Sequence, residues 1–162
     1  MQVELDPSAI KRAQLPHNLL ISALFGFNLL MAPAVIALKF GMIGLLIPFL
    51  STGALIGAIY LRSRKQTLWF VDAHWRLAFK NSRWLMLGYA ITALLVLVAW
   101  LVSLAAANPS MGHIIWTALT RIAILPTLAG VMITAIMEAG AISLASKREV
   151  PDSLVASFPP QV

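Results

Sequence analysis

The sequence contains no cysteine and few charged residues, and both shortages exclude classes of protein. Without cysteine, the 162-residue chain cannot form a disulfide, a thiolate metal site, an iron–sulfur cluster or a cysteine nucleophile. Charged residues make up 11% of the chain, whereas a soluble domain averages about 25%. So few charges cannot cover a water-facing surface, and the composition therefore excludes a soluble globular fold.

Hydrophobic residues make up 60% of the chain and fall in long blocks. A helix needs about 20 residues to cross a hydrocarbon core of roughly 30 Å, and an open sheet would leave backbone groups unpaired there. We therefore predict an all-α membrane protein, with a bundle of four transmembrane helices within residues 17–145. The spans are predicted at about 18–38, 42–61, 85–107 and 114–145.

Lysine and arginine collect on one side of these spans. Ten lie in the N-terminal tail (1–16), in the loop between the second and third spans (62–84) or in the C-terminal tail (146–162), whereas only Lys39 lies on the opposite side. Cytoplasmic loops carry such an excess. The pattern predicts a multi-pass protein of a bacterial inner membrane with both termini in the cytoplasm. Since the membrane already explains the net charge of +6, no nucleic-acid partner is predicted.

The loop from 62 to 84 has the pattern of an amphipathic helix lying at the cytoplasmic membrane surface. One stripe is apolar and includes Trp75, and the other is basic, with Asp72 spaced for an ion pair with Arg76. Such a segment binds anionic lipid headgroups or offers a docking surface to a partner protein. The residues predicted to make these contacts are Trp75, Arg76, Lys80 and Arg83.

Two ionisable residues, Arg121 and Glu138, lie within the fourth hydrophobic block. They are 17 residues apart, or roughly 25 Å along a helix, so they cannot pair within one straight helix. One interpretation places each at a membrane interface, with Glu138 beside Arg62, Arg12 or Lys11. The alternative is functional: Arg121 contacts an anionic ligand or a partner carboxylate, and Glu138 accepts a proton.

Small and polar residues inside the spans favour close helix packing. Gly53 and Gly57 form a GxxxG motif that would admit a neighbouring helix, from this chain or another. A second set combines helix-bending prolines with polar side chains, and it serves either packing or a small cavity open to the outer side. That set comprises Asn28, Pro33, Pro48, Ser51, Thr52 and Pro126.

The three histidines do not predict a cofactor or metal site. His17 and His74 are expected on the same side of the membrane but at the protein surface, and His113 is expected on the other side. A haem held by two histidines needs both imidazoles on one iron. The sequence also has no nucleotide-binding glycine loop and no pairing of a serine with a base, so no cofactor and no enzymatic activity are predicted.

Three functions are compatible with these features. The leading hypothesis is a non-catalytic accessory or scaffold subunit of a larger membrane complex, in which Arg121, Gly53 and Gly57 contact other subunits or lipid. The alternative is a small homo-oligomeric transporter or channel that uses Glu138 and Arg121. The third is a protein that binds lipid or quinone in the kinked outer region.

Overall fold

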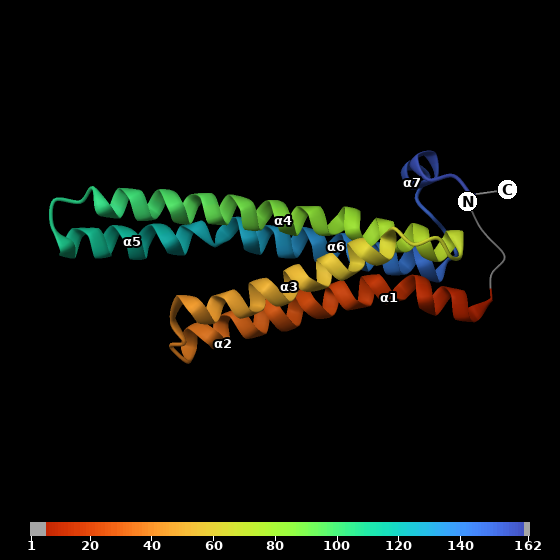
Figure 1. Ribbon diagram of the computed structural model, residues 1–162, viewed down its shortest axis with the longest axis horizontal. Coiled ribbons are helices and arrows are strands. Elements are labelled where there is room, and N and C mark those ends of the chain that lie inside the picture. The colour runs from red at the N-terminus through yellow and green to blue at the C-terminus, as the bar shows by residue number, and fades with distance from the viewer. Residues whose placement is uncertain (1–5, 161–162) are drawn as a thin grey trace. The chain divides into compact units, whose positions relative to one another are not determined.

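The computed structural model describes residues 6–160, apart from the side chains of residues 41–43 and 45, and no strand occurs in this part of the chain (Figure 1). The helices are α1 (Pro7–Ala23), the π-helical segment η1 (Leu24–Met31), α2 (Ala32–Ala37), α3 (Gly41–Ser63), α4 (Trp69–Leu104), α5 (Pro109–Ala123), α6 (Leu125–Ser146) and α7 (Asp152–Ser157).

Within the described residues, four helical stretches are long and apolar enough to cross a membrane. They are Pro7–Ala37, Leu46–Ser63, Trp69–Leu104 and Pro109–Ser146. This confirms the predicted all-α class and the predicted number of helices able to span a membrane. The fourth stretch is divided at Ile124, where α5 ends and α6 begins just before Pro126.

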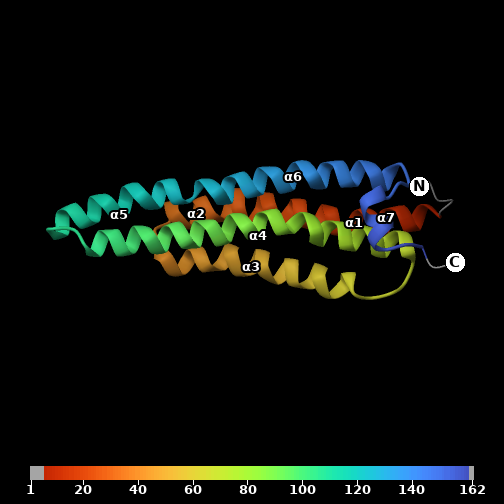
Figure 2. The same cartoon turned by 90° about the horizontal axis from the view of Figure 1, so that it is seen from above.

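The chain forms two compact units. The first comprises residues up to Ser82 together with those from Ala135 onward, and the second comprises Arg83–Thr134. In the first unit, α1, η1 and α2 run antiparallel to α3 (Figures 1 and 2). At the wide turns of η1, Asn28 donates through Nδ2 to Thr52 Oγ1 at 3.2 Å, and Thr52 donates to the carbonyl of Pro48 at 2.8 Å. These three members of the predicted polar set therefore join η1 to α3.

The core of the first unit gathers α1, the start of α4, the end of α6 and the C-terminal segment. Alanines allow close approach of the helices, and larger side chains fill the space between them. The core residues are Ala13, Phe70, Ala73, Leu77, Ala141, Ala145, Val150 and Leu154. The short helix α7 is held there because Trp69 donates through Nε1 to the carbonyl of Phe158 at 2.9 Å. This core supports the buried polar residues described below.

Residues 69–84, predicted as part of a separate surface helix, are the first turns of the continuous helix α4. Trp75 of the predicted apolar stripe is buried, but so is every residue from Phe70 to Trp75, with Asp72 and His74 among them. The residues of this segment that pack into the core are Phe70, Ala73 and Leu77. The segment is helical as predicted, but its first turns are buried on more than one side instead of lying on a surface with one apolar stripe.

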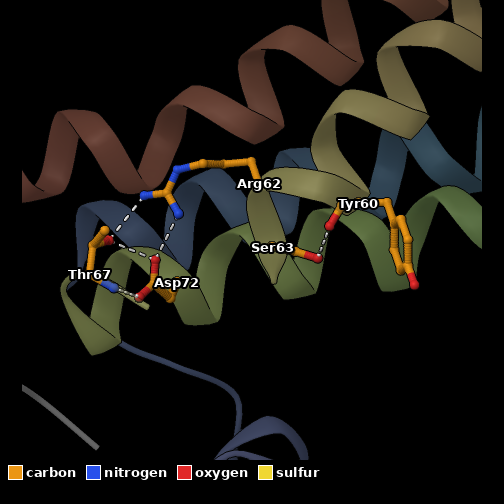
Figure 3. Close-up of polar contacts among 5 residues, drawn as sticks. All are labelled: Tyr60, Arg62, Ser63, Thr67 and Asp72. Atoms are coloured by element: carbon orange, nitrogen blue, oxygen red, sulfur yellow. Dashed lines mark hydrogen bonds and ion pairs between the residues drawn. The ribbon is translucent and has the colours of Figure 1, made fainter. Parts of the chain in front are cut away.

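The ion pair predicted between Asp72 and Arg76 is wrong. Asp72 instead accepts from Arg62 Nη1 at 3.0 Å, and from the hydroxyl of Thr67 at 2.8 Å (Figure 3). It also accepts from the backbone N–H of Thr67. The carboxylate therefore closes the turn before α4 and joins it to the end of α3, because the connection between the two helices is short enough to bring Arg62 back to it.

In the second unit, the later part of α4 packs closely on the first part of α6. A Cβ atom at Gly88 would lie 2.6 Å from the carbonyl oxygen of Pro126, and one at Gly130 would lie 3.0 Å from that of Trp84. A hydrogen bond of 2.8 Å from Thr127 to Thr92 also joins these helices. Glycine is required at Gly88 because only a hydrogen atom fits between the two backbones.

Candidate functional site

Four polar side chains from three helices meet in the interior of the first unit. His17 comes from α1, His74 and Asn81 from α4, and Glu138 from α6. The two histidines and the glutamate are 0% exposed, and Asn81 is 2% exposed. Burying such groups in an apolar protein interior is costly unless they bond to one another. Their mutual contacts therefore determine what the site can do.

The four side chains form one continuous line of hydrogen bonds. Asn81 donates through Nδ2 to Glu138 Oε1 at 2.8 Å. The other carboxylate oxygen, Oε2, lies 2.6 Å from His17 Nδ1. Nε2 of His17 lies 3.0 Å from His74 Nδ1, and Nε2 of His74 lies 3.2 Å from the backbone carbonyl oxygen of Glu149. We call these four side chains the Glu–His–His chain.

The backbone carbonyl of Glu149, which ends this line of hydrogen bonds, determines which histidine ring nitrogens carry a hydrogen atom. A carbonyl oxygen can only accept, so we assign the hydrogen to Nε2 of His74. With His74 neutral, its Nδ1 accepts, and His17 must donate to it through Nε2. One further proton then lies between His17 Nδ1 and Glu138 Oε2, either as an imidazolium–carboxylate pair or as a neutral imidazole and a carboxylic acid. The distance of 2.6 Å is shorter than that of most N–H···O hydrogen bonds, in either arrangement.

The same proton has a third position. If it moves to His74, that ring donates from both nitrogens, and His17 becomes neutral with its hydrogen on Nδ1. All three arrangements contain the same number of protons, have no net charge and use the same hydrogen bonds. None of the three arrangements buries a net charge, but the two with an ionised glutamate bury a pair of opposite charges, which costs desolvation energy.

The environment of the Glu–His–His chain is apolar. The edge of the His74 ring meets the Phe70 ring, with centroids 4.8 Å apart. Leu20, one turn after His17 on α1, is fully buried. Hydrogen bonds are stronger in such surroundings than in water. The helices thus provide a buried site with an ionisable group from each of α1, α4 and α6.

The structure corrects two predictions at this site. His17 and His74 are fully buried, whereas the sequence placed them at the surface. Glu138 bonds to His17 and Asn81 and not to Arg62, Arg12 or Lys11. Instead, Arg62 pairs with Asp72, and Arg12 donates to Ser8. The correction follows from packing: α1 turns His17 toward Glu138 on α6, and α4 turns His74 toward His17 and the carbonyl of Glu149.

The other predicted site residues lie outside the Glu–His–His chain. Trp75 is buried beneath the guanidinium of Arg62, 5.4 Å from the ring centroid, while Lys80 and Arg83 are exposed. Arg76 is partly buried, with its guanidinium 3.6 Å from the centroid of the Phe158 ring. These residues share the first turns of α4, but they face different surroundings.

Within residues 6–160, Arg121 has no polar partner and the GxxxG motif has no closely packed helix. Arg121 is exposed on α5, in the second unit, and it has no hydrogen-bond or ion-pair partner among residues 6–160. A Cβ atom added to Gly53 or Gly57 would meet nothing within 4 Å. Within the described part of the chain, the motif therefore does not hold another helix closely.

Both ring nitrogens of each buried histidine are occupied by hydrogen bonds. In residues 6–160, no group of three histidine, aspartate or glutamate side chains is arranged to hold a metal ion. The continuous hydrogen bonds make the movement of a proton a chemistry that this arrangement can support. No protein-family model matches the chain, and no similar curated protein or solved structure was found.

Proposed function

We propose that the protein is a small proton-coupled membrane transporter in which Glu138, His17 and His74 hold and exchange one proton. The observation that carries the proposal is the unbroken line of hydrogen bonds from Glu138 to His74. Acidic and histidine residues inside membrane helices are rare, and they mark proton relays and ion pathways. Neither catalysis nor a cofactor is part of the proposal.

The last hydrogen bond of the Glu–His–His chain, from His74 to a backbone carbonyl, favours a transporter over an open proton channel. His74 donates to the carbonyl of Glu149, which cannot take up the proton and pass it on. The site is therefore suited to storing a proton and releasing it when the structure around it changes. A lone bundle of four helices leaves little space for a substrate path, so the transporter is proposed to work as a homo-oligomer, with Arg121 as a contact for an anionic substrate.

The proposed orientation is that of a bacterial inner-membrane protein with both termini in the cytoplasm. The one-sided distribution of lysine and arginine supports it. The N-terminal half of α1, the start of α4 and the C-terminal segment pack together, which fits both termini on one side of the membrane. In this orientation Glu138 lies about two turns from the cytoplasmic end of α6. The exchanged proton would then come from or go to the cytoplasm.

The test is proton movement into liposomes that contain the purified protein, started by an inward gradient of small organic anions and followed with an internal pH dye. We expect Glu138→Gln to lower the flux at least about tenfold, since an amide cannot accept the proton at neutral pH. Glu149→Gln is the matched control, because Glu149 contributes its backbone carbonyl to the site, and its flux should equal that of the wild type. A Glu138→Gln flux equal to the wild type, or a wild-type flux equal to that of empty liposomes, contradicts the proposal.

The open face of α3 favours a second candidate function, an accessory subunit of a larger membrane complex. Gly53 and Gly57 leave space for a helix of another chain, and Leu50 and Leu61 on the same helix are 61% and 65% exposed. A close helix contact at such a motif is a common basis of association in membranes. Arg121 would contribute a contact with a partner carboxylate or a lipid headgroup.

This candidate predicts that Gly57→Leu and Arg121→Ala reduce assembly. After extraction in mild detergent, wild-type chain should migrate in a large complex on a native gel, and each variant should shift toward the free chain. Gly57→Ala, which tests the motif with a single added carbon, should leave the stability of the free chain unchanged or slightly raised, since a Cβ atom there meets nothing within 4 Å. Migration of wild type as an assembly of this chain alone would favour the transporter.

A further inference from the structure

A second polar feature lies in the first unit, where the end of α3 meets the start of α4. A hollow of about 280 Å³ is lined by Ser63, Arg64 and Arg76. Two of its three lining residues are arginines, and none is acidic. The nearby carboxylate of Asp72 accepts hydrogen bonds from Arg62 and Thr67, as Figure 3 shows, so it is already engaged. The hollow is therefore cationic.

Aromatic rings hold both arginines in place. The guanidinium of Arg64 lies 5.5 Å from the centroid of the Tyr60 ring, and that of Arg76 lies 3.6 Å from the centroid of the Phe158 ring. A guanidinium stacked on a ring keeps its N–H groups free at its edge, and two parallel N–H groups match the oxygens of a phosphate. Such stacking reduces the side-chain entropy that binding would otherwise cost.

An unsatisfied buried atom points to a missing partner. Nε of Arg76 is buried and has no hydrogen-bond partner within residues 6–160. A buried donor without a partner costs about 1–3 kcal/mol, and an ordered water or an ion commonly completes such an atom. The hydroxyl of Ser63 donates to the carbonyl of Tyr60 at 2.7 Å, which leaves its oxygen lone pairs to accept from a ligand. The hollow thus offers donors for an anion beside one acceptor.

We propose that this hollow binds a phosphate group through Arg64 and Arg76, with Ser63 accepting from a hydroxyl on the same ligand. A lipid headgroup and a free phosphate ester both supply this chemistry. The site does not include the proton-exchanging residues. It assigns phosphate binding to a defined pair of arginines instead of to the whole basic stripe that the sequence predicts on this segment.

The test measures binding to the purified full-length chain in dodecyl maltoside by native mass spectrometry. The probes are phosphatidylglycerol, inorganic phosphate, and a neutral glycolipid without phosphate. We expect phosphatidylglycerol to bind at least about tenfold more tightly than the glycolipid. Arg64→Gln and Arg76→Gln should each weaken it by about fivefold or more. Competition by millimolar inorganic phosphate would identify a free phosphate as a ligand of the same site, and its failure to compete would assign the site to lipid.

Lys80→Gln is the matched control, because it removes an exposed positive charge from the same helix without touching the hollow. It should leave phosphatidylglycerol binding within about twofold of the wild type. Arg64 is exposed, so Arg64→Gln tests the site even if Arg76→Gln unfolds the protein by releasing Phe158. Equal losses in Lys80→Gln and Arg64→Gln, or equal binding of the glycolipid, would overturn the proposal.

Discussion

Replacing Glu138 by alanine should lower the free energy of unfolding by about 3–5 kcal/mol. The carboxylate is fully buried and bonds to His17 and Asn81, so its removal leaves two buried polar groups without partners. Removing one member of a buried charged pair typically costs this much, and the cavity left by the side chain adds to the loss. The measurement is unfolding by sodium dodecyl sulfate in dodecyl maltoside micelles, followed by circular dichroism.

Glu138→Gln is the control that separates the carboxylate's shape from its charge. The glutamine amide can donate to Nδ1 of a neutral His17, while its oxygen still accepts from Asn81. Every hydrogen bond of the Glu–His–His chain is then preserved, so the stability should stay within about 1 kcal/mol of the wild type. The glutamine variant thus isolates the loss of proton exchange from any loss of folding. If the alanine variant is as stable as the glutamine variant, Glu138 is not the buried hydrogen-bonding partner described here.

The hydrophobic blocks were sufficient to predict the all-helical class and the number of membrane-crossing helices, because crossing a membrane sets a minimum length of apolar helix. Periodicity also predicted a helix in residues 69–84. It could not show that this helix is buried on more than one side. The core that includes Ala13, Ala141 and Leu154 covers Phe70, Ala73 and Leu77, which do not belong to the predicted apolar stripe.

The buried histidines were missed although the sequence contains a signal for them. His17 follows Ala13 by four residues and precedes Leu20 by three, so it lies on the buried stripe of α1. His74 has the same relation to Phe70 and Leu77 on α4. Their places at the edges of hydrophobic blocks favoured a surface interpretation. The partner of each could not be predicted, because the contact from His17 to Glu138 joins residues 121 positions apart.

The requirement for glycine at position 88 was also invisible in the sequence, and it yields a second large effect. Gly88→Ala should lower the free energy of unfolding by about 1–3 kcal/mol, measured by the same detergent titration. Its Cβ atom would lie 2.6 Å from the carbonyl oxygen of Pro126, a backbone atom that cannot rotate away. The two helices must therefore separate, which weakens the neighbouring contact of Gly130 and the bond between Thr127 and Thr92.

The matched control is Gly53→Ala, at the open face of α3, where an added Cβ atom meets nothing within 4 Å. Alanine is the better helix former by about 0.5–1 kcal/mol, so this variant should be as stable as the wild type or slightly more stable. The same intrinsic gain operates at Gly88, so the difference in stability between the two variants measures the steric conflict. Equal stabilities for the two variants would show that α4 and α6 do not approach each other as closely as their glycines allow.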